Sequence, residues 1–290
     1  MKKIAAVALS ILMAFCVGCN YGMESSVDSS SVENTKKTWE EMTEAERIDF
    51  LDVEFDDVYY ADLFYELDGD GNNEAISVKN TPTRENSPLK NKTFAFLGSS
   101  ETVGAMSDGE AFPQYLAKRN DCTSVVHAKS GATLCTAYQQ VAPYVEMLKN
   151  FSQSQAFDGF FVCLSPNDSW FIDDFGTVSD GFDIDSFDQS KTYGALEYIL
   201  AYAKQTWGCD LYVYTDVFWV SDTYPEMIEN AKLIAKKWGA KLIDLYSDKE
   251  FNDINQRQRM LYMADDVHPL KAGYRFWWTP QFEKYILSIK

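Results

Sequence analysis

The stretch Phe160-Phe161-Val162-Cys163-Leu164, followed at once by Ser165-Pro166-Asn167-Asp168, decides the fold of this 290-residue chain. The apolar run is too short for a typical helix and lacks the polar alternation of a strand with one solvated face. It predicts a strand over residues 157–164 that is buried on both faces, as strands of parallel sheets are. Parallel sheets bind ligands beyond the carboxyl ends of their strands, so the polar residues that follow mark a candidate site.

The same pattern recurs on both sides of this strand, where short apolar runs alternate with segments of helical periodicity. The expected strands cover residues 94–97, 124–128, 157–164, 211–215 and 241–245. The expected helices cover residues 111–118, 138–149, 192–206, 225–237 and 271–289. Such alternation predicts an α/β fold in which helices cover both faces of a five-stranded parallel sheet.

Polar residues follow four of the predicted elements. In chain order they are Gly98-Ser99-Ser100-Glu101, Ser130-Gly131-Ala132, Ser165-Pro166-Asn167 and Asp265-Asp266-Val267-His268-Pro269. A serine hydroxyl needs an adjacent base to act as a nucleophile, and Ser100 with His268 supplies both groups. Asp265, three residues before His268, can reach the far ring nitrogen and stabilise the imidazolium.

Together these blocks resemble those of the SGNH/GDSL hydrolases, a family of esterases and lipases. The segment 86–100 is similar to a bacterial subgroup with Gly-Ser-Ser in place of Gly-Asp-Ser, and the resemblance spans about residues 87–290. It implies a three-layer α/β/α, flavodoxin-like fold with Ser100 as nucleophile, His268 as base and Asp265 as its partner. It also implies an oxyanion hole formed by the backbone amides of Ser100 and Gly131 and the side-chain amide of Asn167.

Three residues depart from the family pattern. Ser99 replaces the usual Asp, and Ser165 replaces the usual Gly two residues before Asn167. Glu101 follows the nucleophile where an apolar residue is common. Its carboxylate is expected either to oppose oxyanion formation or to hold a substrate hydroxyl, so the three changes leave open a weakened activity.

The N-terminus is typical of a bacterial export signal. Lys2 and Lys3 precede an apolar stretch over residues 4–17, which is too short to span a bilayer comfortably. The stretch ends in Cys16-Val17-Gly18-Cys19, which resembles a lipobox, although Cys16 stands where Leu is usual. An ordinary secretory signal that is cleaved nearby is the alternative.

From this we expect a lipoprotein signal peptide at 1–18, lipid on Cys19 and a flexible tether at 19–38. An N-terminal accessory segment at 39–91 and a hydrolase domain at 92–290 follow. Residues 39–66 carry apolar side chains at roughly helical spacing and predict one or two short helices. The protein would then be exported and anchored to the cell membrane or surface by lipid alone.

The composition disfavours several classes of binding partner. The formal net charge of -18 and the sequence pI near 4.5 disfavour nucleic acid and anionic membrane faces. The cysteines that remain after the lipobox show no Cys-x-x-Cys pair, so we expect no zinc. We also expect no other metal and no cofactor. A buried free thiol is the favoured state of Cys163. No pattern indicates an oligomeric state.

Several other motifs have structural explanations beside functional ones. Residues 68–74 alternate acidic and amide side chains like a calcium loop, but they lack the EF-hand Gly and Glu, and a plain turn is favoured. His127 ends a predicted strand and favours a structural role. Trp170, Phe171 and Trp219 follow the third and fourth strands and are candidates for stacking on a sugar ring. Phe218 is equally consistent with stacking and with core packing.

These patterns favour a serine esterase that hydrolyses short acyl esters, acetyl esters above all, on a small molecule or polysaccharide. One alternative is a non-catalytic glycan-binding surface lipoprotein, for which a complete Ser100, His268 and Asp265 set would serve no purpose. The other is a lipase or lysophospholipase of the same fold.

Overall fold

The computed structural model describes residues 37–43, 45–47 and 60–288, all of which belong to one compact unit, Lys37–Lys290. The predicted signal peptide at 1–18, the Cys19 lipid site and nearly all of the tether at 19–38 lie outside the described residues. Much of the predicted helical region at 39–66 also lies outside them. Within the described residues, no helix has both the length and the apolar character needed to cross a bilayer.

A five-stranded sheet forms the centre of the fold. Its strands are β1 (Thr93–Gly98), β2 (Thr123–Ala128), β3 (Gly159–Cys163), β4 (Asp210–Tyr214) and β5 (Lys241–Ile243). They lie in the order β2-β1-β3-β4-β5, and each neighbouring pair is parallel. Every residue of β3 is buried, as the apolar run predicted. The predicted fold class is thereby confirmed.

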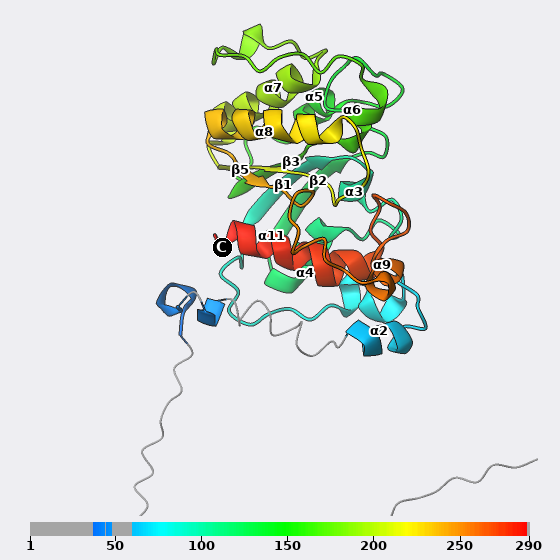
Figure 1. Cartoon of the computed structure of the whole chain (residues 1–290). Coiled ribbons are helices and arrows are strands. Elements are labelled where there is room, and N and C mark those ends of the chain that lie inside the picture. The colour runs from blue at the N-terminus through cyan, green and yellow to red at the C-terminus, as the bar shows by residue number, and fades with distance from the viewer. Residues whose placement is uncertain (1–36, 44, 48–59, 289–290) are drawn as a thin grey trace, which may run out of the picture. The chain divides into compact units, whose positions relative to one another are not determined.

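Helices cover both faces of this sheet (Figure 1). On one face lie α5 (Tyr144–Met147), α7 (Thr192–Trp207) and α8 (Tyr224–Trp238), and on the other lie α4 (Phe112–Asn120) and α11 (Thr279–Ile286). The long helix α8 has Pro225 in its first turn, where a missing N–H costs no hydrogen bond. It ends at Gly239, whose φ of +69° is a conformation that glycine adopts without a steric penalty.

Two predicted helices differ from the structure. The helix expected over 138–149 exists only as α5 and a following 3-10 turn, Leu148–Asn150, because Pro143 keeps the residue before it out of the helical region. The helix expected over 271–289 is divided into α10 (Lys271–Gly273), a π-helical turn (Tyr274–Trp278) and α11. Pro280 lies in the first turn of α11 and cannot donate a helical hydrogen bond.

The segment before β1 packs on the same core as the sheet. It contains α2 (Tyr60–Glu66) and two 3-10 turns, Glu74–Ile76 and Val78–Asn80, after an earlier turn at Trp39–Glu41. Leu63, Leu67, Ile76 and Leu89 all belong to the hydrophobic core. The carbonyl of Gly71 also accepts a hydrogen bond from the amide of Ala272 in α10. Residues 63–89 are therefore packed against the part of the chain that follows His268.

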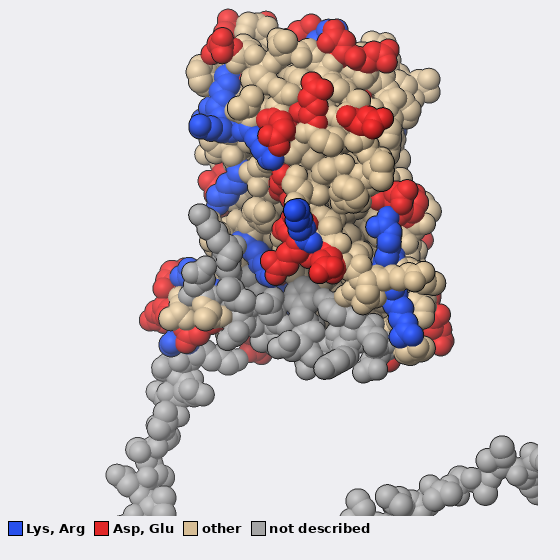
Figure 2. Space-filling view, viewed as in Figure 1, with Lys and Arg blue, Asp and Glu red and all other residues tan. Residues whose placement is uncertain are grey.

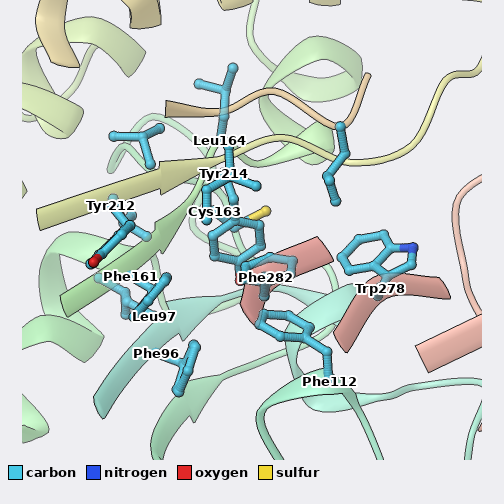
Figure 3. Packing of buried hydrophobic residues seen from close by; sticks show 14 of the residues in the cluster. Phe96, Leu97, Phe112, Phe161, Cys163, Leu164, Tyr212, Tyr214, Trp278 and Phe282 are labelled. Carbon is cyan, nitrogen blue, oxygen red and sulfur yellow. The ribbon is translucent and has the colours of Figure 1, made fainter. Parts of the chain in front are cut away.

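Aromatic rings join the sheet to the helical layer formed by α4 and α11 (Figure 3). Phe161 in β3 stacks on Tyr212 with ring centroids 4.2 Å apart and on Phe96 at 4.7 Å. Phe112 of α4 stacks on Phe282 of α11 at 4.0 Å. Burying each such ring contributes about 1.5–3 kcal/mol. This packing fixes the strands whose carboxyl ends carry the polar blocks.

A buried ionic cluster ties α11 to the same layer. Glu283 accepts hydrogen bonds from Arg84 at 2.7 Å and from Arg119 at 3.1 Å, and its side chain is fully buried. Burial alone would raise the pKa of Glu283, but the two guanidinium groups outweigh it and lower that pKa to about 2. Breaking a buried ion pair is strongly destabilising, so this cluster fixes the position of α11.

Candidate active site

Ser100 begins the short helix α3 (Ser100–Val103), directly beyond the end of β1. The turn is tight, because a Cβ on Gly98 would lie 1.7 Å from the hydroxyl of Thr102. Gly104, with φ +75°, ends the helix after one turn. The side chain of Ser100 is nearly buried, with 6% of its surface exposed. This geometry holds the hydroxyl at the carboxyl edge of the sheet.

His268 and Asp265 lie in a turn after α9 (Gln256–Tyr262). A bridge between Met263 and Pro269 closes this turn. One oxygen of Asp265 accepts the backbone amides of Val267 at 2.9 Å and His268 at 2.8 Å. Its other oxygen lies 2.7 Å from Nδ1 of His268. These contacts place the ring proton on Nδ1 and leave Nε2 as an acceptor.

The opposite ring nitrogen faces Ser100. Nε2 of His268 lies 2.9 Å from Oγ of Ser100, so the two side chains are within hydrogen-bond distance. The structure therefore brings the three residues predicted for the triad into one continuous line of hydrogen bonds. Partial burial alone would raise the pKa of Asp265, but its three hydrogen bonds outweigh that effect and hold the pKa below its usual value.

Asn167, another predicted oxyanion-hole residue, contacts Ala132, the residue that follows the predicted Gly131. Gly131 has φ +77° in the turn after β2, and Asn167 lies in the first turn of α6 (Pro166–Phe171). The side-chain amide of Asn167 donates to the carbonyl of Ala132 at 3.1 Å, which leaves its second N–H for another acceptor. In Figure 1, α3 and α6 lie at the same end of the sheet.

Ser165 connects the same two blocks. Its hydroxyl donates to the carbonyl of Ala132 at 2.9 Å and accepts the backbone amide of Asn167 at 3.2 Å. Asn167 and the Gly131–Ala132 turn are thereby held together by a side chain that a glycine at position 165 would lack. Ser165 therefore supports the position of Asn167 beside this turn.

Asp168 is a contributor that the sequence reasoning missed. Its fully buried carboxyl group accepts the amide of Leu134 at 2.8 Å and the hydroxyl of Thr192 at 2.8 Å. Burial raises its pKa to about 6, against the opposing effect of these hydrogen bonds. The carboxyl group joins α6, the loop after Gly131 and the start of α7. The only available sequence signal was its place directly after Asn167.

Glu101 and Asp216 were also not foreseen as buried groups. Glu101 is 1% exposed and accepts hydrogen bonds from the hydroxyls of Ser99 and, at 3.1 Å, Ser100. Asp216 follows β4, and one of its carboxyl oxygens has no hydrogen-bond partner within the described part of the chain. Burial, followed by the charge of Glu101, raises the pKa of Asp216 well above its usual value.

The predicted sugar-stacking residues divide into two groups. Trp170 and Phe171, on α6 just after Asn167, are 48% and 46% exposed. Trp219 is only 6% exposed and packs against Tyr224 at 4.3 Å, with Trp170 6.0 Å away, so it supports the surface rather than forming it. Tyr138, which the sequence did not single out, stacks on Phe171 at 4.5 Å with the rings 8° from parallel. Phe218 is 51% exposed rather than buried.

Acidic side chains accompany these rings. The loop between α6 and α7 crosses the top of the view in Figure 1, and acidic side chains gather in that region in Figure 2. The exposed acidic residues of this loop are Asp173, Asp174, Asp180, Asp183, Asp185 and Asp188. Lys191 pairs with Asp174 at 2.6 Å. The loop presents an acidic surface that follows directly from the aromatic residues of α6.

The other motifs that the sequence offered are the 68–74 turn, His127 and the cysteines, and their contacts are structural. Among the described residues, no cluster of three His, Cys, Asp or Glu side chains is placed to hold a metal ion. In the 68–74 turn, Asn72 donates to the carbonyl of Met106 at 2.9 Å and accepts the amide of Lys271 at 3.1 Å. His127 packs edge-on against Phe151 at 4.4 Å, and partial burial lowers its pKa. The four cysteines within the described ranges, Cys122, Cys135, Cys163 and Cys209, are free thiols.

Comparison with known proteins extends these findings. No protein-family model matches the chain, and no curated protein matches its sequence. A solved structure of a protein from Lactobacillus plantarum is 19% identical and has a TM-score of 0.57, over 69% of this chain and 98% of that one. A candidate GDSL-like lipase from Bacteroides uniformis is 18% identical with a TM-score of 0.51, over 68% of this chain and 95% of that one. The chain thus has the α/β/α fold of this GDSL-like protein.

Proposed function

We propose that the protein is a serine esterase that hydrolyses short acyl esters, acetyl esters above all, on carbohydrate. The observation that carries the proposal is the hydrogen-bonded line from Asp265 through His268 to Ser100. A glycan-binding protein without catalysis would have no need for this alignment. The fold of the present chain, which is shared with a candidate GDSL-like lipase, is consistent with the proposal.

The reaction would proceed in two halves. His268 removes the hydroxyl proton of Ser100 at Nε2 while Oγ forms a bond to the ester carbonyl carbon. The negative charge that develops on the carbonyl oxygen faces the amides of Ser100 and Gly131 and the free N–H of Asn167. Collapse of this intermediate breaks the bond to the alcohol, which leaves with the proton from His268. Water then repeats the sequence and releases the acid from Ser100.

The exposed residues of α6 support a carbohydrate as the alcohol component. Trp170 and Phe171 present aromatic faces, onto which the C–H surfaces of a pyranose ring can stack. The adjacent loop supplies carboxylates that accept hydrogen bonds from sugar hydroxyls. The net charge of -18 disfavours approach to anionic lipid surfaces, which argues against a phospholipid substrate.

We further propose that the protein is exported and anchored by lipid on Cys19, as the lipobox-like sequence indicates. A surface location would give a polysaccharide access to the site.

The function is tested by measuring kcat/KM on acetyl, butyryl and decanoyl esters of one chromogenic alcohol, and then acetate release from acetylated xylan. We expect the acetyl ester to be the best substrate and xylan to release acetate. A preference for the decanoyl ester with no acetate from any acetylated glycan would instead support a lipase.

A further inference from the structure

The side chain of Glu101 contacts the proposed nucleophile directly. It follows Ser100 in α3 and is 1% exposed, so neither solvent nor a substrate hydroxyl has ready access to it. One carboxylate oxygen accepts the hydroxyl of Ser99, and the other lies 3.1 Å from Oγ of Ser100. Both oxygens are thus engaged by the two serines of the Gly-Ser-Ser turn.

The hydroxyl of Ser100 therefore has two acceptors but only one proton. Nε2 of His268 lies at 2.9 Å and the Glu101 oxygen at 3.1 Å. Because Asp265 places the ring proton on Nδ1, Nε2 is an acceptor and donates nothing to Oγ. The Ser100 proton can point to the imidazole or to the carboxylate, and rotation about the Cβ–Oγ bond exchanges the two states.

The surroundings of Glu101 favour the carboxylate as the acceptor. A hydrogen bond to an ionised acceptor is about twice as strong as one between neutral groups. Within the described ranges, no Lys or Arg forms an ion pair with Glu101 that would weaken this pull. Both oxygens of Glu101 already act as acceptors, one toward the hydroxyl of Ser99 and the other toward that of Ser100.

We propose that Glu101 restrains the nucleophile by competing with His268 for the hydroxyl proton of Ser100. This inference rests on the proposed esterase function and deepens it. In the restrained state the proton lies on the Glu101 side, and Oγ cannot pass it to Nε2. Each attack then requires the hydroxyl to turn toward His268 first, which lowers the fraction of molecules that are ready to react.

The substitution Glu101→Gln tests this restraint. The glutamine oxygen still accepts the Ser99 hydroxyl, while its NH₂ group donates to Oγ of Ser100 and leaves His268 as the only acceptor for the serine proton. We expect the variant to react with a fluorophosphonate about fivefold faster than the wild type, from the difference between charge-assisted and neutral hydrogen bonds. Glu101→Met, which offers no acceptor of comparable strength, is expected to change the rate in the same direction.

Glu110→Gln is the matched control. Glu110 is a partly buried carboxylate that accepts the amide of Val78 at 2.9 Å and has no contact with Ser100. The Glu110→Gln substitution is expected to leave the labelling rate unchanged. Faster labelling supports the restraint, since damage to the fold would slow the reaction. Equal or slower labelling of both Glu101→Gln and Glu101→Met, each shown to be folded, would overturn it. If neither the wild type nor the variant is labelled, the esterase function itself fails and the restraint with it.

Discussion

Nε2 of His268 lies 2.9 Å from Oγ of Ser100, although the two residues are 168 positions apart in the chain. The parallel sheet brings the end of β1 to this edge, and the Met263–Pro269 bridge fixes the turn that carries His268. Packing of α10 against the segment before β1 holds that turn from the other side. The contact is therefore a consequence of the fold as a whole.

Asn167→Ala is expected to lower kcat by roughly 10²–10³-fold with a smaller effect on KM, because its free N–H would serve the transition state. Steady-state kinetics on a chromogenic acetyl ester measure both constants. Ser169→Ala is the control, since it removes a polar group of the same helix whose hydroxyl donates to the carbonyl of Pro166 and has no proposed catalytic role. An unchanged kcat in Asn167→Ala would place the oxyanion hole elsewhere.

Asp168 should make stability depend on pH. Its pKa is raised from the usual 3.8 to about 6 in the folded state. Its contribution is therefore fully present below pH 3.8 and is lost as the pH rises through 6. Relative to Asp168→Asn, the wild type should lose roughly 2–3 kcal/mol of unfolding free energy between pH 4 and 7. Urea denaturation at a series of pH values measures this difference, and parallel curves would show that Asp168 does not titrate in this range.

Trp170→Ala is expected to raise KM on acetylated xylan by about three- to tenfold while leaving a small chromogenic acetyl ester unaffected, because only the polymer reaches an exposed ring. Leu233→Ala, an exposed apolar residue of α8, is the control for loss of surface area. Equal effects of Trp170→Ala on both substrates would argue against a sugar-stacking role.

Cys19→Ala should move the protein from the membrane fraction to the soluble exported fraction of a bacterial host, because the mature chain would then lack its lipid. Fractionation followed by immunodetection measures the distribution. Persistence in the membrane fraction would show that the lipobox interpretation is wrong.

The fold could be predicted from the sequence because β1, β3 and β4 are rich in apolar residues and buried along nearly their whole length. Residues 160–163 show no alternation of apolar and polar side chains, and β3 is buried on both faces as expected. The helix expected over 138–149 was wrong in its first half, because Pro143 keeps the residue before it out of the helical region and α5 begins only at Tyr144. Local sequence order located Ser100, Gly131, Asn167 and His268, since each follows a predicted element.

The burial and the contacts of the site residues could not be predicted from the sequence. Burial of Glu101 depends on how α3 packs against β4 and the turn at Tyr274, which no local pattern records. The role of Asp168 depends on Leu134 and Thr192, which lie in other parts of the chain. Trp219 differs from Trp170 only through the packing of Tyr224 and Tyr246 around it. Such tertiary contacts decide which polar and aromatic side chains face the substrate.

The central claim is that the Ser100 hydroxyl, activated by His268, is the nucleophile. The most direct measurement is fluorophosphonate labelling followed by mass mapping of the modified residue, with ester hydrolysis by Ser100→Ala measured in parallel. We expect the label on Ser100, and a loss of hydrolysis on the order of 10⁴-fold or more in a folded Ser100→Ala protein. A label on another residue, or undiminished turnover in Ser100→Ala, would contradict the account.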